Sequence, residues 1–131
     1  MKTIILTATM LLTFGMANAQ KVANVESGGK LKICNLTSSN NTTSCSTIES
    51  SGVSIASLGS SKIAILYTTG KLKVCSVTSS NNTTGCSTIE SSGVSNVQMS
   101  GDSRIIITYD NGKKKACNIT SSNNTSGCST L

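Results

Sequence analysis

Six cysteines stand in three pairs, and each pair encloses ten residues. Thiols of this kind form disulfides, bind metal ions or act as nucleophiles. The sequence contains no histidine, and ten intervening residues is not the spacing of a zinc knuckle. We therefore predict three local disulfides and no metal site. The predicted pairs are Cys34–Cys45, Cys75–Cys86 and Cys117–Cys128.

Acid–base catalysis has few candidate residues in this sequence. Catalysis near neutral pH usually recruits histidine or a tuned pair of carboxylates. Glu49 and Glu90 occupy the same position of two repeats, which favours a structural or surface role. Oxidised cysteines leave no thiol nucleophile. We predict a protein that is not an enzyme, with no catalytic residue and no cofactor.

The pattern K-x-K occurs at three equivalent points of the chain, the third time with Lys114 in the middle, and the chain has a net charge of +6. Alternation places the outer lysines of each triplet on one face of a strand. Such a stripe could bind anionic glycans or cell-surface polysaccharide. Protection of an exposed strand edge is the alternative, and nucleic acid is disfavoured because stacking aromatics are missing. The six lysines are Lys30, Lys32, Lys71, Lys73, Lys113 and Lys115.

The polar segments SSNNTT, SSNNTT and SSNNTS lie between the cysteines of each pair. Their amides and hydroxyls could hydrogen-bond sugars, and loops on a rigid scaffold often carry function. Ordinary turn formation is the alternative, since Asn and Ser bond readily to their own backbone. The candidate loop residues are Asn40, Asn41, Asn81, Asn82, Asn123 and Asn124.

The elements that must position these residues recur with a period of 41 and then 42 residues. Apolar strands flank turn signals at Thr69-Gly70 and Asn111-Gly112, which predicts β-hairpins. The cysteines of each pair lie symmetrically about the second turn, so a hairpin there places them opposite each other. A fourth short strand, SIASLGS or SNVQMSG, follows within each unit.

Four short strands in about 42 residues are typical of a propeller blade. We predict an all-β fold of three four-stranded repeats of about 41 residues, arranged as propeller-like blades. A β-trefoil is the alternative, because three units of this length close that fold. Asn24 and Glu26 replace the Ile and Tyr of the later repeats, which resembles the polar cap of an open array.

The segment GVSNVQMSGDSRIIITYDNGKKKACNITSSN resembles the repeat of RCC1-type β-propellers. In those repeats a V-x-x-V strand leads to a glycine turn, an apolar strand, a D-G turn and a strand that ends in Cys. The resemblance implies a propeller fold, and it transfers no functional residue. The matching positions are Val94, Val97, Gly101, Asn111-Gly112 and Cys117.

The first 19 residues predict a secretory signal peptide, with Lys2, an apolar stretch and an Ala17-Asn18-Ala19 cleavage site. Residues 20–131 then form one all-β repeat domain, with repeats at about 20–61, 62–103 and 104–131. We expect a secreted protein, extracellular or periplasmic, with no membrane span after cleavage.

About eleven strands make fewer than three full blades, and three blades do not close a ring alone. We therefore expect a homo-oligomer, either a six-bladed ring of two chains or a head-to-tail filament. Our first hypothesis is a non-catalytic extracellular structural or adhesive protein that self-assembles through incomplete β-repeats. A lectin-like module that binds glycans or polyanions is the alternative, and a truncated relic of a longer propeller is a third interpretation.

Overall fold

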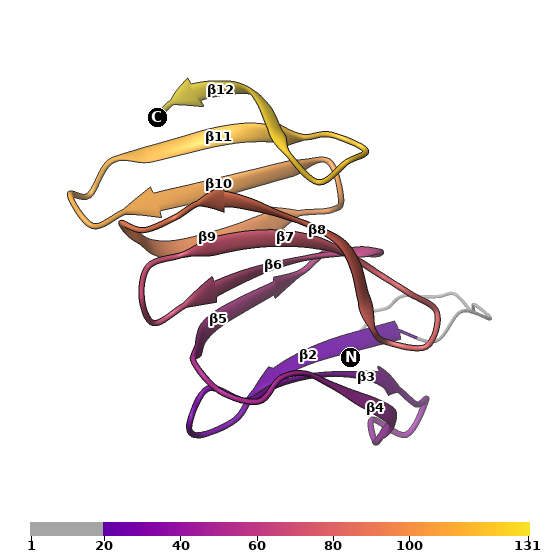
Figure 1. The fold of residues 1–131 in the computed structure, drawn as a ribbon. Coiled ribbons are helices and arrows are strands. Elements are labelled where there is room, and N and C mark those ends of the chain that lie inside the picture. Colours follow the sequence, from indigo (N-terminus) through magenta and orange to yellow (C-terminus); the bar gives the residue numbers. More distant parts are fainter. Residues whose placement is uncertain (1–19) are drawn as a thin grey trace, which may run out of the picture.

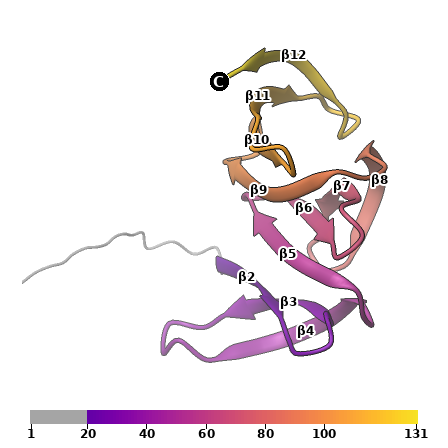
Figure 2. The same cartoon turned by 90° about the vertical axis from the view of Figure 1, so that its left-hand side faces the viewer.

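A computed structural model describes residues 20–131, whose eleven strands form three antiparallel sheets stacked in a row (Figure 1). The sheets lie one above another without sharing strands, as the perpendicular view shows (Figure 2). Each sheet is a meander in chain order, as in a propeller blade. The predicted all-β class with propeller-like blades is confirmed. The predicted signal peptide, 1–19, lies outside the described residues.

Each sheet is named here as a blade. The first blade contains β2 (Gln20–Val25), β3 (Leu31–Leu36) and β4 (Thr42–Glu49). The second blade contains β5 (Val53–Leu58), β6 (Lys62–Tyr67), β7 (Leu72–Val77) and β8 (Thr83–Glu90). The third blade contains β9 (Val94–Ser100), β10 (Arg104–Tyr109), β11 (Lys114–Ile119) and β12 (Thr125–Thr130).

The connecting strands β5 and β9 determine where one blade ends and the next begins. Each pairs with the strand that follows it in the chain, so it is the first strand of its own blade. The blades therefore span residues 20–49, 53–90 and 94–130. Their boundaries differ from those of the predicted repeats, 20–61, 62–103 and 104–131, which were counted from the first hairpin. In the described part of the chain the first blade has three strands and the other two have four.

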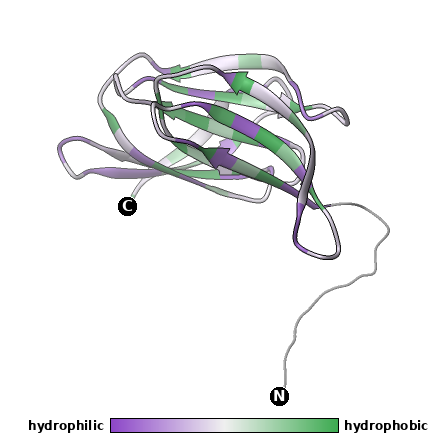
Figure 3. Ribbon diagram, turned by 90° about the horizontal axis from the view of Figure 1, so that it is seen from below, coloured by the Kyte–Doolittle hydropathy of each residue, from purple (hydrophilic) through white to green (hydrophobic). Residues whose placement is uncertain are grey.

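Two apolar layers hold the stack together, one at each junction between blades. Ile63 and Ile65 on β6 are fully buried in the layer shared with the first blade. Ala64 and Leu66 on the same strand are buried in the layer shared with the third blade. Successive side chains of a strand point to opposite faces, which is why the residues from Ile63 to Leu66 are all apolar. Hydrophobic segments, in green, accordingly run along the strands of the stack (Figure 3). Each buried Ile or Leu contributes roughly 1.5–3 kcal/mol.

The β-trefoil alternative does not describe this chain, because all strand pairing lies within single blades. Backbone-to-backbone hydrogen bonds between blades join a hairpin turn of one blade to the start of the next blade. The Val53 amide donates to the Gly29 carbonyl at 3.0 Å, and the Val94 amide donates to the Gly70 carbonyl at 3.1 Å. In the part of the chain that the structure describes, no helix is long and apolar enough to cross a membrane.

Candidate functional site

All three predicted disulfides are present. Cys75 and Cys86 join β7 to β8 at a bulge, with their Cα atoms 4.0 Å apart, and the other two pairs occupy the same place in their blades. Cys75 is fully buried, whereas Cys86 is exposed. Each disulfide therefore closes the hairpin that carries the polar loop. Three disulfides fit a protein that resides in an oxidising compartment.

Asn81, in the polar loop of the second blade, is fully buried against the first blade. Its amide donates to the Ser44 carbonyl at 2.7 Å and to Asn35 Oδ1 at 3.1 Å. Lys21 of the first blade donates to the Asn81 side-chain oxygen and to the Ser79 carbonyl. This predicted loop residue is therefore a polar tie between two blades.

Asn123 has the corresponding place between the third blade and the second, and it is 2% exposed. Its side-chain oxygen has no partner among the described residues, whereas that of Asn81 accepts from Lys21. Its amide donates to the Gly85 carbonyl at 2.8 Å and to Ser76 Oγ at 2.9 Å. Lys62 replaces Lys21 and donates to the Thr120 carbonyl at 2.8 Å. Two successive junctions thus use the same four chain positions.

The other four asparagines of the polar loops are exposed, namely Asn40, Asn41, Asn82 and Asn124. Asn40 is the counterpart of Asn81 and Asn123, but no blade precedes it in the described part of the chain. Their role in sugar binding stays a prediction. The sequence does contain a signal for this contact, because Asn recurs with the repeat period at one turn position. In the structure that position has a φ near +65° in all three blades. Period alone did not separate a turn residue from a contact between blades.

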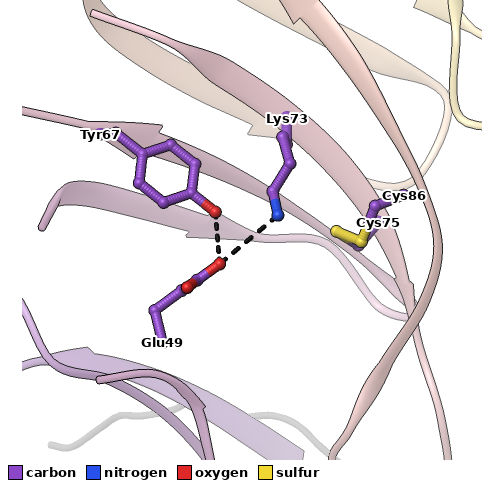
Figure 4. Close-up of polar contacts among 5 residues, drawn as sticks. All are labelled: Glu49, Tyr67, Lys73, Cys75 and Cys86. Atoms are coloured by element: carbon purple, nitrogen blue, oxygen red, sulfur yellow. Dashed lines mark hydrogen bonds and ion pairs between the residues drawn. A yellow bond between two sulfur atoms is a disulfide. The ribbon is translucent and has the colours of Figure 1, made fainter. Parts of the chain in front are cut away.

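Glu49 lies at the end of β4 and faces the second blade (Figure 4). Its carboxylate accepts a hydrogen bond from the Tyr67 hydroxyl and forms an ion pair with Lys73 at 3.4 Å. Burial, and then the hydrogen bond to Glu49, raise the pKa of Tyr67. Burial disfavours the charge of Lys73, but the neighbouring Tyr67 and Glu49 outweigh it and raise the pKa of Lys73.

Glu90 has the same place at the second junction. Its carboxylate accepts a hydrogen bond from the Tyr109 hydroxyl at 2.6 Å. Burial, with this hydrogen bond second, raises the pKa of Tyr109 to about 12. Lys115 lies 5.4 Å above the Tyr109 ring. The recurring glutamates therefore anchor the next blade, in line with the structural role predicted for them.

Asp102, in the turn between β9 and β10, caps the matching turn of the second blade. Its carboxylate accepts bonds from the Ser61 amide at 3.0 Å and from the Ser61 hydroxyl at 2.6 Å. Burial disfavours the charge, but the bonds from Ser61 and Ser60 outweigh it and lower the pKa of Asp102. No periodic pattern marks this contact, because the second repeat has Ser60 at the position of Asp102.

The six predicted polyanion-binding lysines fall into three groups. Lys32 pairs with Glu26 at 3.4 Å and Lys73 pairs with Glu49, so their charges are balanced within the chain. Lys113 and Lys115 are exposed and, with Lys114, line an open pocket of about 220 Å³ that also includes Tyr109, Asn111 and Thr130. Lys30 and Lys71 lie in turns, the latter 5.9 Å from the Tyr67 ring.

Two sheet faces at the ends of the stack have no blade against them in residues 20–131 (Figure 2). The N-terminal end face is the side of the first blade that carries Asn24 and Glu26, since the alternate residues Ala23 and Val25 pack on the second blade. The C-terminal end face is the side of the third blade with Ile106, Thr108, Lys114, Ala116 and Asn118. Both faces are more polar than the buried ones.

In those parts of the chain that the structure describes, no group of three or more His, Cys, Asp or Glu residues is placed to hold a metal ion. The arrangement offers hydrogen bonding, ion pairing and apolar contact. Its recurring chemistry therefore joins one blade to another.

Stacked four-stranded meanders of this kind define a propeller-like β-repeat protein. No family model matches the sequence, and no curated protein matches it significantly. The fold is similar to that of human WBSCR16, an RCC1-like β-propeller protein, with a TM-score of 0.57 and 13% sequence identity. The match covers 82% of this chain and 32% of WBSCR16, so the chain spans about a third of that protein's length. At this identity the likeness concerns the fold.

Proposed function

We propose that this chain is an exported, non-catalytic structural or adhesive protein that associates with further copies of itself through the end faces of its blade stack. The three disulfides support export, because such bonds persist outside the cytosol. Kinship of its repeats with RCC1-type propellers is part of the proposal, supported by the motif positions from Val94 to Cys117 and by the shared fold.

One observation carries the association. Each junction within the chain covers a sheet face with an apolar layer and ties it with loop contacts. The two end faces correspond, by their place in the repeat, to the faces that are covered at these junctions, but no blade lies against them in the described residues. Uncovered blade faces and edges favour partners that complete the stack. The polar residues on these faces make such an association weaker and more reversible than the junctions within the chain.

Light scattering on the exported, oxidised protein tests this proposal. The full coding sequence is expressed in a secreting host, and the intact mass of the product locates its N-terminus. We expect the weight-average mass to rise above that of one chain as the concentration increases from about 1 to 100 μM, a range that covers modest affinities. A constant monomer mass across that range contradicts self-assembly.

Binding of anionic polymers is a second candidate function, favoured by the pocket beside Lys113, Lys114 and Lys115. Three lysines contribute to its lining, which includes no acid. An anionic glycan could pair with the lysines, with Tyr109 and Asn111 as neighbouring groups. Such binding is electrostatic and weakens as salt screens the charges.

Retention on a heparin resin tests this second function. We expect the Lys113→Gln/Lys115→Gln variant to elute at clearly lower salt than the wild-type protein. The matched control is Lys32→Gln/Lys73→Gln, which removes the same charge from lysines already paired with glutamates. Equal loss of retention in both variants would show a response to net charge alone, and would contradict a site at the pocket.

A further inference from the structure

We propose that a second copy of this chain docks in one defined orientation, head to tail. The 37–41 loop of one copy binds a socket on the third blade of the next. The socket consists of Arg104, Asn118, the Gly127 carbonyl and Ser129. This inference rests on the proposed self-assembly and specifies its contact.

The first junction within the chain provides one template for this contact. The loop of the second blade binds four groups of the first blade. Lys21 reaches the loop carbonyl of Ser79, and Ser46 Oγ donates to the Ser80 carbonyl at 3.0 Å. Asn35 and the Ser44 carbonyl accept from the amide of the buried loop asparagine.

The second junction repeats these contacts with the loop of the third blade. Ser87 Oγ donates to the Ser122 carbonyl at 2.8 Å, as Ser46 does to the Ser80 carbonyl. Ser76 and the Gly85 carbonyl accept from the buried asparagine, and a lysine again reaches a loop carbonyl. The loop therefore docks on one constant set of groups: a cation on β2 or β6, a polar side chain on β3 or β7, and a carbonyl and a serine on β4 or β8.

The third blade retains all four groups of this socket. One repeat further along the chain, they are Arg104, Asn118, Gly127 and Ser129. All four residues are exposed, and no further loop covers them in the described part of the chain. The Asn118 amide nitrogen lies 2.9 Å from the position of a Cβ built on Gly127, so the side chain and the carbonyl are neighbours, as at the first junction. A polar face that only ended the stack would not need these four groups.

The first blade presents the matching loop in its docking conformation. Asn40 has a φ of 65°, and the buried Asn81 and Asn123 both have a φ of 68°. The backbone N–H of Asn40 donates to the Thr37 carbonyl at 3.0 Å, and the backbone N–H groups of Asn81 and Asn123 donate in the same way to the threonines of their own loops. The loop is thus preorganised without a neighbour, which reduces the entropic cost of binding.

Opposite charges on the end faces favour the same orientation. Within the chain, Leu72 of the second blade and Tyr109 of the third belong to one apolar cluster. The repeat period places Lys114 at the position of Leu72, and Glu26 at the position of Tyr109. A head-to-tail contact therefore brings Lys114 of one copy towards Glu26 of the next. Glu26 is paired with Lys32 within its own copy, so only a contact between two C-terminal end faces would place like charges, those of Lys114, together.

Two variants, each blocked at one end, test the orientation. Asn40→Gly keeps the positive φ and removes the amide, and Arg104→Glu places a carboxylate where loop carbonyls would dock. We expect each variant alone to need at least tenfold higher concentration to associate, the effect of about 1.4 kcal/mol. Mixed in equal amounts, they should form 1:1 dimers that do not grow, because each retains one working end.

Matched controls separate this contact from general effects. Asn41→Ala changes the neighbouring exposed asparagine, and Arg104→Lys installs the residue type that both internal junctions use. We expect both controls to associate like the wild-type protein, and all four variants to keep its thermal midpoint at concentrations where every protein is monomeric. Wild-type-like association of Asn40→Gly or Arg104→Glu, or a mixture without 1:1 dimers, would overturn the inference. A monomeric wild-type protein would instead overturn the proposed function itself.

Discussion

At the scale of single residues, one asparagine performs two tasks. Asn and Asp tolerate a positive φ better than other residues with a Cβ, so Asn81 forms its turn at little cost. Its amide then reaches across to the first blade and uses both of its donors. Turn preference explains the first task, whereas the second depends on which surface lies opposite.

Substitution of this asparagine separates the two tasks. We expect Asn81→Gly to lower the free energy of unfolding by about 1–3 kcal/mol, because the Ser44 carbonyl and Lys21 lose a buried partner. Asn40→Gly is the matched control, since it changes the same turn where nothing docks within the described chain. Urea unfolding at concentrations where both variants are monomeric measures the difference, and equal effects would contradict the tie.

The tyrosines provide a readout of the junction carboxylates. The pKa of Tyr109 is raised to about 12, so the folded chain favours the neutral phenol. Its contribution to stability is complete below the ordinary pKa of 10 and is lost as the pH rises towards 12. We expect Glu90→Gln to lower this pKa while leaving it above 10, because burial, the larger cause, remains.

Phenolate absorbance of a Tyr67→Phe background measures this shift, because the chain has two tyrosines and this variant leaves one. Glu49→Gln in the same background is the control, since it changes the other junction. An unchanged titration of Tyr109 in the Glu90→Gln variant would show that the carboxylate has no influence on it.

At the scale of elements, the glycine turns connect hairpin geometry with blade stacking. Gly70 and Gly112 end equivalent turns, with φ of 86° and 85°. A Cβ on Gly70 would lie 2.8 Å from the Gly93 amide nitrogen, whereas a Cβ on Gly112 would meet nothing within 4 Å. Glycine is therefore needed at position 112 only for its positive φ. At position 70 it is needed for the positive φ and also for the close approach of the neighbouring backbone.

Alanine at these two glycines should therefore have unequal effects. Gly112→Ala introduces only the left-handed strain, about 1–2 kcal/mol. Gly70→Ala adds a clash with the backbone of the third blade, so we expect a clearly larger loss of stability. Thermal denaturation of the two variants measures this difference. Equal midpoints would mean that the second and third blades do not approach as closely as the structure indicates.

The disulfides should act on the central blade as staples of one hairpin. Replacement of Cys75 and Cys86 together by alanine releases a short loop, and we expect a loss of about 3 kcal/mol in the free energy of unfolding. Urea denaturation measures this loss against a Cys117→Ala/Cys128→Ala variant, whose disulfide encloses the same number of residues. A midpoint like that of the wild-type protein would contradict a stabilising role.

Sequence patterns predicted the elements well, because local chemistry sets them. The hairpins at Gly70 and Gly112 and all three cysteine pairs follow from turn residues and from symmetry about the loop. The sequence did not reveal at which strand each blade begins. Strands β5 and β9 can pair with the strand before or after them, and only the registers decide.

At the scale of the whole molecule, the repeat period predicted the stack, but the contacts within it depend on three dimensions. Asn81 and Asn123 were expected as binding residues of exposed loops, yet the neighbouring blade buries both. Asp102 has no counterpart in the other repeats, so no periodic signal marks it. The polar residues Asn24 and Glu26 do occupy an end face, as the cap interpretation requires.

Every strand pairs only with its neighbour in sequence, and every disulfide joins cysteines 11 positions apart. Contacts of such short range are associated with fast folding. A blade therefore needs nothing from later parts of the chain to form its sheet and close its disulfide. If the chain is exported as proposed, the first blade can pair its strands and oxidise while the third is still being translocated, so maturation would proceed from the N-terminus onward.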